Sequence, residues 1–251
     1  MNALNPASRI LRFDGARNVR DLGGLPARGG TTRHGVLFRA DGLSRLTDAD
    51  LERLAALRLR TIIDLRYDEE RDRAPDRLPG ENAPDFFHCG FHPQGTSELF
   101  VALNGGVAGA EEMARIMCRN YSIMPFEHAP QFRDAMHHVI APERAPHLIH
   151  CASGKDRTGL IIAFLLFALG VERDVVFHDY ELSNVEWQPV DVIGATARAE
   201  AVAAVMAAHP SYLEAALAAI EARCGSVDAY LEEWLGFGAR ERDALARLMI
   251  A

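Results

Sequence analysis

The sequence predicts an α/β fold in which a central, mostly parallel sheet is flanked by helices. Short runs of β-branched and aromatic residues alternate with helical patterns, and the sequence after Gly170 is helical throughout. A length of 251 residues is enough to bury a substantial core. No repeat or linker divides the chain, so we expect one domain over 1–251 that ends in a C-terminal helical layer.

The predicted strands are short and are separated by helical patterns. They are 36–39, 61–65, 86–89 and 147–150. The first helix should begin at Thr47, which is a good N-cap residue followed by acidic residues. Leu51, Leu54 and Leu57 then share one face, as in an amphipathic helix.

Further helices are expected before and after the last strand. Helical spacing recurs over 111–140 and is interrupted at Pro125 and Pro130, which predicts at least two helices. The apolar run 160–169 is far shorter than the roughly 20 residues of a membrane-spanning helix. We interpret it as a buried helix and expect no transmembrane segment.

Five helical segments should form the C-terminal layer. They are 173–183, 195–208, 212–224, 227–235 and 240–249. The Ala-rich part of this region is interpreted either as a packed helix pair or as a helical lid inserted at about 186–209.

Composition and charge exclude several classes of protein. Hydrophobic residues make up 49% and charged residues 25%, the balance of an ordinary globular protein. The formal net charge of −8 disfavours a nucleic-acid partner, which would need a broad basic face, but it allows one concentrated anion pocket.

The N-terminal sequence and the cysteines indicate a reducing compartment. The N-terminus lacks a basic segment followed by an apolar one, so we expect a cytoplasmic protein, with export by a route that needs no such signal left open. Cys89, Cys118, Cys151 and Cys224 are expected to be thiols. No pair of ligands with zinc spacing follows His88, Cys89 and His92, so neither a metal nor a cofactor is expected.

The most informative segment is 150–159, with the sequence HCASGKDRTG, between the last predicted strand and the apolar helix. A strand, a tight loop and a helix N-terminus direct several backbone N–H groups at one point, and the helix dipole adds positive potential there. This arrangement predicts a phosphate cradle. Its substrate-binding residues would be Ala152, Ser153, Gly154, Lys155 and Thr158.

Cys151 and Arg157 carry the predicted chemistry. A thiolate is a good nucleophile, and a helix N-terminus with a nearby arginine favours the thiolate form. The planar guanidinium of Arg157, with five residues between it and Cys151, would lie across the loop and bind two phosphoryl oxygens.

The remaining loop residues have predicted supporting roles. Gly154 permits a backbone conformation that other residues resist, and Gly159 would let the helix pack closely on the sheet. Thr158 is expected to donate a hydrogen bond to the Cys151 sulfur, and His150 to brace the loop rather than to transfer a proton.

At these residues the chain resembles the protein tyrosine phosphatase superfamily, and the GKDRTG loop is similar to that of bacterial atypical phosphatases that act on phosphotyrosine, phosphoserine/threonine and phosphoinositides. Other segments that look like this family are 18–24, 37–41, 63–66, 179–184 and 225–235. The resemblance implies a central sheet flanked by helices and a phosphomonoester hydrolase with a cysteinyl-phosphate intermediate.

The resemblance also bears on the general acid. It implies Asp156, since similar enzymes place an acid at this position of the loop. Asp64 is the second candidate because it ends a predicted strand at the edge where α/β proteins bind ligands, although it could instead pair with an arginine. Two interpretations remain for Arg20 and Asp21: they position the loop, or they form a structural ion pair.

The sequence therefore predicts a metal-independent protein-tyrosine phosphatase with a phosphorylated protein as substrate and with phosphate or vanadate as active-site ligands. A phosphoinositide phosphatase and a catalytically silent phosphoprotein-binding module are the alternatives. Lys155 bears on the first alternative, since it could contact a second phosphate on an inositol ring, or instead pair with Asp156 or another carboxylate.

Overall fold

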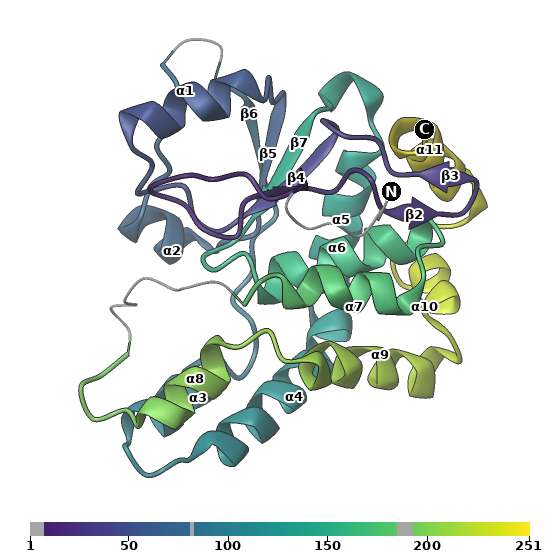
Figure 1. Cartoon of the computed structure of the whole chain (residues 1–251). Coiled ribbons are helices and arrows are strands. Elements are labelled where there is room, and N and C mark those ends of the chain that lie inside the picture. Colours follow the sequence, from purple (N-terminus) through teal and green to yellow (C-terminus); the bar gives the residue numbers. More distant parts are fainter. Residues whose placement is uncertain (1–7, 81–82, 185–192) are drawn as a thin grey trace.

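The computed structural model describes residues 8–80, 83–184 and 193–251 and contains a five-stranded sheet (Figure 1). The strand order is β1-β4-β7-β5-β6, and only β1 runs antiparallel to its neighbour. A separate hairpin pairs β2 with β3. The strands are β1 Arg20–Asp21, β2 Pro26–Ala27, β3 Gly30–Thr31, β4 Leu37–Ala40, β5 Thr61–Asp64, β6 Asp85–His88 and β7 His147–His150.

The helices are distributed over both faces of the sheet. Their bounds are α1 Asp48–Ala56, α2 Asp68–Arg73, α3 Thr96–Asn104, α4 Ala110–Glu127, α5 Ala129–Val139, the 3₁₀ turn η2 Pro142–Arg144, α6 Asp156–Ala168, α7 Arg173–Glu181, α8 Ala199–Met206, α9 Pro210–Cys224, α10 Val227–Glu233 and α11 Ala239–Met249.

Alternation along the strands gives the sheet two apolar faces. Phe38, Ile62 and Leu148 belong to a core that also contains Leu54 of α1. Their strand neighbours on the opposite face belong to a larger core with the buried residues of α4 to α7 and α9 to α11. Because both faces are covered, the central strands are fully buried, as parallel strands usually are.

The structure confirms the predicted fold class. All four predicted strands form, each within one residue of its predicted bounds. Thr47 caps α1 in a capping box with Asp50, as its residue type indicated. β1, the β2–β3 hairpin, α2 and α3 were not predicted.

The predicted interruption at Pro125 was wrong. Pro125 lies inside α4, and the break before α5 comes at His128. Pro125 is within the last turn, and the helix continues past it, since the His128 N–H still donates to the Met124 carbonyl. The Pro125 carbonyl accepts a hydrogen bond from Tyr230. Pro130 lies in the first turn of α5, where an N–H is not required, and therefore favours that helix start.

The region of the proposed lid contains α8, which packs on α4 beside α3 (Figure 1). Residues 186–192 of that prediction lie outside the described residues. Among the described helices, none alone is long and apolar enough to cross a membrane, and one bent pair, α8 with α9, passes the same length and composition test together.

Candidate active site

The predicted phosphate loop lies at the carboxyl edge of the sheet, where β7 ends at His150 and α6 begins at Asp156. Cys151 is buried, with 1% of its surface exposed. The backbone N–H of Gly154 donates to Cys151 Sγ at 3.2 Å. A main-chain donor therefore already contacts the sulfur, as a phosphate cradle requires.

Gly154 allows the loop to pass close to the neighbouring strand. Its φ is +64°, and a Cβ atom there would lie 2.2 Å from the carbonyl oxygen of Ala40. The carbonyl of Gly154 accepts hydrogen bonds from Asn18 Nδ2 at 2.9 Å and from Arg39 Nη2 at 2.6 Å. The conformation of the loop is thus fixed from behind by two side chains distant in sequence.

A buried ion cluster holds those two side chains. Arg9, Arg20 and Arg39 all pair with the carboxylate of Asp179 on α7, and Arg20 also bonds Asn18. Burial alone would raise the pKa of Asp179, but the adjacent guanidinium groups hold it well below its usual range. Arg20 therefore supports the loop through Asn18. Asp21 instead accepts hydrogen bonds from the N–H groups of Gly23 and Gly35 and lies 3.2 Å from His34 Nδ1, away from the phosphate loop.

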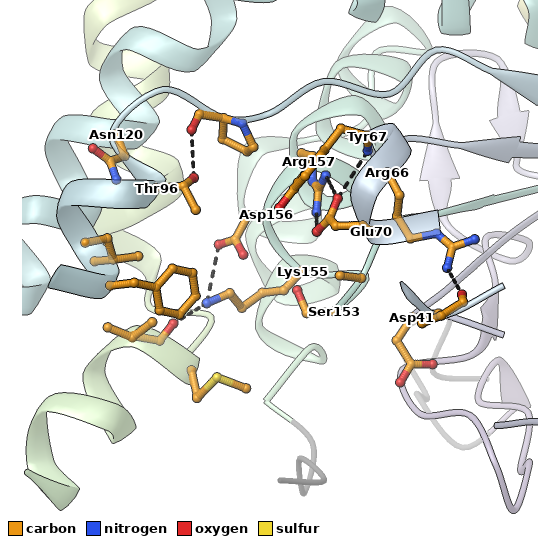
Figure 2. A pocket seen from close by; sticks show the side chains of 18 of the residues that line it. Asp41, Arg66, Tyr67, Glu70, Thr96, Asn120, Ser153, Lys155, Asp156 and Arg157 are labelled. Carbon is orange, nitrogen blue, oxygen red and sulfur yellow. Dashed lines mark hydrogen bonds and ion pairs between the residues drawn. The ribbon is translucent and has the colours of Figure 1, made fainter. Parts of the chain in front are cut away.

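Arg157 is held in place by Glu70 of α2 in a bidentate ion pair, with N–O distances of 2.6 and 2.7 Å (Figure 2). Its Nη1 also donates to the carbonyls of Leu65 and Phe91. Burial opposes the charge, yet Glu70 and Cys151 raise the pKa of Arg157, so the guanidinium stays positive. No sequence signal had indicated Glu70, because α2 is short and has no buried residue.

Asp156 lines the cavity beside Lys155 and Arg157. Its side chain is partly exposed at 28%, and its Oδ1 accepts a hydrogen bond from the Tyr121 hydroxyl at 2.6 Å. Lys155 Nζ lies 3.3 Å from the same oxygen. Tyr121, which the sequence analysis did not identify, orients the carboxyl from α4.

Asp64 is placed differently from what the acid role would need. Its carboxylate is completely buried, pairs with Arg66 at 2.8 Å and is absent from the lining of the cavity. Burial would raise its pKa, but His150 and Arg66 lower it below the usual range, which favours the ionised form. The geometry thus favours the arginine-pairing interpretation and disfavours Asp64 as proton donor, because it cannot reach a bound substrate.

Lys155 is not the exposed cation that its place in the loop suggested. Its side chain is 3% exposed, and Nζ donates to the carbonyl of Val205 at 2.5 Å and that of Ala207 at 3.2 Å. These carbonyls are at the C-terminal end of α8. The ammonium group is therefore shared between α8 and Asp156, as in the second of the two predicted alternatives.

Three further expectations for the loop can be compared with the structure. Thr158 Oγ1 is buried and has no hydrogen-bond partner among the described residues, so the predicted bond to Cys151 is wrong; Gly154 N–H takes that place. Gly159 packs against the ring of Tyr180 on α7, where a Cβ would lie 3.0 Å from two ring carbons, rather than on the sheet.

His150 braces the loop as expected. Its Nδ1 lies 3.3 Å from the carbonyl of Cys151, and its Nε2 lies 3.3 Å from the Asp76 carboxylate. Burial lowers the pKa of His150, but Asp76 and Asp64 outweigh it and raise the pKa. A protonated ring carries a positive charge, which the Asp76 and Asp64 carboxylates next to Nε2 balance.

Asp64, Asp76 and His150 also form the one group among the described residues whose ligand atoms approach closely enough for a metal ion. Arg66 pairs with both carboxylates, at 2.8 and 2.6 Å. Since the guanidinium already supplies the positive charge, this group is better described as a buried ion-pair network than as a metal centre.

The loop opens into a cavity of about 400 Å³. Ala152, Ser153, Lys155, Asp156 and Arg157 line its floor. The wall formed by α3, α4 and α8 is largely apolar, and the opposite wall is polar. The apolar wall comprises Leu99, Phe100, Met117, Tyr121, Met124, Val205 and Met206, interrupted by Thr96 and Asn120, and the polar wall includes Arg17, Asp41, Ser44, Arg45, Arg66 and Arg73.

A buried thiol, a fixed guanidinium and a carboxyl at the mouth of a phosphate cradle are the parts that cysteine-based phosphate ester hydrolysis needs. Residues 11–251 match the family model described as the tyrosine phosphatase family. The chain belongs to this family.

Two relatives of known name agree with this assignment. A candidate tyrosine-protein phosphatase of Cupriavidus necator is 32% identical over 241 residues, which cover 90% of this chain and 84% of the relative. The triple specificity protein phosphatase PtpB of Mycobacterium tuberculosis is 32% identical over 196 residues, covering 70% and 69% of the two chains. The crystal structure of TpbA from Pseudomonas aeruginosa aligns over 72% of this chain and 86% of its own, with 16% identity and a TM-score of 0.31.

The family assignment makes this chain a protein-tyrosine phosphatase, as predicted. Around its loop, the supporting residues that sequence reasoning missed are Asn18, Arg39, Glu70 and Tyr121. Asn18 and Arg39 lie in segments that had been quoted for the family resemblance, so that resemblance was the available signal. For Glu70 and Tyr121 the sequence offered none.

Proposed function

We propose that this phosphatase hydrolyses phosphomonoesters, with phosphotyrosine as its main substrate, through a covalent intermediate on Cys151 and without a metal ion. The observation that supports this most is the position of Cys151 Sγ. It is buried at the N-terminus of α6, contacted by the Gly154 N–H and faced by a guanidinium that Glu70 orients.

In the first step the Cys151 thiolate attacks phosphorus. The S–P bond forms while the bond between phosphorus and the leaving oxygen breaks, and Asp156 gives that oxygen its proton. Arg157 and the loop N–H groups bind the equatorial oxygens, whose charge they match best in the transition state. In the second step water attacks phosphorus, Asp156 accepts a proton from the water, and the thiolate leaves.

The cavity supports an aryl ester. Its volume of about 400 Å³ and its apolar wall on α3 and α4 fit a ring that carries a phosphoryl group. The phosphoinositide alternative drew on the resemblance of the loop and on Lys155. The Lys155 amine is occupied by the Val205 and Ala207 carbonyls, which weakens the second of these arguments. Activity on phosphoserine or phosphothreonine peptides is proposed as the weaker, second activity.

The test is Cys151→Ser measured with a chelator present. We expect turnover of a phosphotyrosine peptide to be lost while the fold and phosphate binding remain, since the hydroxyl replaces only the nucleophile. Vanadate should inhibit the wild-type enzyme competitively, because it can adopt the bipyramidal geometry of the transferring phosphoryl group. Substantial chelator-resistant turnover by the variant would contradict the assignment, and phosphate binding by an inactive wild type would identify a silent binding module.

A further inference from the structure

Asn120 is a buried amide that the chemistry described above does not use. It lies on α4, is 5% exposed and lines the cavity, next to Tyr121, which orients Asp156. Its Oδ1 has no hydrogen-bond partner, and its amide makes no hydrogen bond to any other described residue. The Nδ2 group, unlike Oδ1, is not fully buried, and it too has no partner among the described residues. An amide donor that is open to an otherwise apolar wall of the cavity is available to an acceptor that arrives with the substrate.

The surrounding backbone fits closely around this amide. Gly95, with φ of +82°, precedes α3 and packs on the Asn120 side chain, where a Cβ would lie 2.3 Å from Oδ1. The same Cβ would lie 3.1 Å from Nδ2, so Gly95 leaves room for the whole amide. Of its two ends only Oδ1 is fully buried, so Nδ2 is the end that keeps access to the cavity. Figure 2 shows the amide beside Thr96, across the cavity from Tyr67, Glu70 and Arg157.

The charge of this wall limits what Asn120 can recognise. The residues that α3 and α4 contribute to the cavity are all uncharged, and the cations of the lining come from other segments. A second phosphate or a carboxylate would lack a counter-charge at this position. A neutral acceptor, such as a peptide carbonyl, matches the N–H donor of an amide that lies in an apolar wall.

We propose that Asn120 is a specificity-determining residue that donates a hydrogen bond to a main-chain carbonyl of the phosphopeptide, close to the phosphotyrosine. This inference rests on the proposed function. It distinguishes peptide substrates from small aryl phosphates, because only the peptide carries the carbonyl. The binding of the phosphoryl group itself does not involve Asn120.

The test compares Asn120→Ala with wild type on a phosphotyrosine peptide and on p-nitrophenyl phosphate. We expect kcat/KM for the peptide to fall about 3- to 10-fold, mainly through KM, as for the loss of one neutral hydrogen bond, with p-nitrophenyl phosphate unaffected. Ser122→Ala is the matched control, since Ser122 lies on the same helix outside the lining of the cavity and its hydroxyl donates to the Arg119 carbonyl. It should change neither substrate.

A second measurement covers the case in which the variant does not fold. Peptides in which one main-chain carbonyl at a time is replaced by a thiocarbonyl, a weaker acceptor, should reveal one position that slows the wild-type enzyme. If Asn120→Ala folds, the thiocarbonyl at that position should not lower the kcat/KM of the variant any further, because the bond is already absent.

Equal losses on both substrates, a loss confined to a soluble phosphoinositide, or a thiocarbonyl series without a sensitive position would each overturn the inference while leaving the proposed function intact. A wild-type enzyme that is inactive on the phosphotyrosine peptide would overturn both.

Discussion

At the scale of single residues, the site depends on how each charged group is fixed. Arg157 could be identified from its spacing to Cys151, but what orients its guanidinium is Glu70, 87 positions earlier in the chain. An arginine that is held in its binding geometry before the substrate arrives loses less side-chain entropy on binding. Glu70 should therefore contribute to transition-state binding without touching the substrate.

Glu70→Gln should lower kcat/KM about 10- to 100-fold, and by the same factor for all substrates. The reason is that a charge-assisted bidentate pair, worth about 1.5–3 kcal/mol, becomes a neutral contact. Steady-state kinetics on a phosphotyrosine peptide and on p-nitrophenyl phosphate would measure this. Glu69→Gln, on the exposed side of the same helix turn, should have no effect. Wild-type kinetics in Glu70→Gln would show that the pair is not needed to orient Arg157.

Asp156→Asn should slow esters with poor leaving groups much more than esters with good ones. A departing oxygen that is already a weak base does not need a proton, so removal of the acid should cost about 10²–10⁴-fold only for the more basic leaving groups. A series of aryl phosphates with different leaving-group acidity measures the dependence. Asp64→Asn serves as the comparison, and the role would pass to Asp64 if that variant alone changed the leaving-group dependence.

The residues whose positions could be predicted from the sequence are those placed by the backbone of the loop. From Cys151 to Arg157 that backbone spans a few positions of strand, turn and helix, where local geometry decides. The orientation of the Arg157 guanidinium was not predictable in this way, because Glu70 sets it. Lys155 belongs to the same loop, yet its environment is set by carbonyls about 50 positions later, which no local pattern encodes. The Asn120 amide was likewise hidden, because an Asn within a helical pattern carries no periodic signal.

At the scale of elements, long and apolar segments were predictable and short or charged ones were not. β7 and α6 are fully buried apart from their ends, so their hydrophobic runs indicated them. β1 has two residues, and α2 has the sequence DEERDR without an apolar face. These two elements form only because tertiary contacts hold them, including the ion pair from Glu70 to Arg157.

Lys155 joins two elements, the phosphate loop and the end of α8. Lys155→Ala should remove both bonds to the α8 carbonyls and leave the last turn of α8 without its cation. We expect faster amide hydrogen exchange in α8 and equal losses of kcat/KM on a phosphotyrosine peptide and a phosphoinositide. A selective loss on the phosphoinositide would instead restore a lipid substrate as the leading alternative.

At the scale of the whole molecule, distant segments meet behind the phosphate loop. Arg20, Arg39 and Asp179 lie in three segments that the sequence analysis had quoted separately, and the structure joins them in one buried cluster. The cluster binds the Gly154 carbonyl through Arg39, and through Arg20 with Asn18. The same ion pairs thus contribute to the stability of the fold and to the shape of the site. Sequence patterns did not predict these pairs, and only the family resemblance pointed to the segments that form them.

Asp41 couples this region to pH. It follows β4 beside the loop, is half-buried and accepts a hydrogen bond from the Arg17 N–H at 2.8 Å. Burial raises its pKa to about 8, against the opposing effects of that hydrogen bond and of the charges of His150 and Arg17. The folded protein therefore holds a proton on Asp41 at neutral pH that the unfolded chain, with an aspartate pKa of about 3.9, releases.

The sign of the effect follows from proton binding. Between about pH 4 and pH 8 the folded state binds the extra proton, so Asp41 makes the free energy of unfolding decrease as the pH rises. Asp41→Asn stays neutral and keeps an oxygen for the Arg17 N–H. The stability of this variant relative to wild type should therefore increase from pH 5 to pH 8. Because Asp41 is partly exposed, we expect a change on the order of 1 kcal/mol, or about 2–4 °C in Tm.

Thermal unfolding of wild type and Asp41→Asn at several pH values measures this difference, and the comparison cancels the titration of groups that both proteins share, such as His150. Asp72→Asn is the matched control, since Asp72 is an exposed carboxylate of α2. Its Tm difference from wild type should not depend on pH. If the Asp41→Asn difference were equally flat, Asp41 would be ionised in the folded protein, and the polar wall of the cavity would carry one more negative charge beside the phosphate loop.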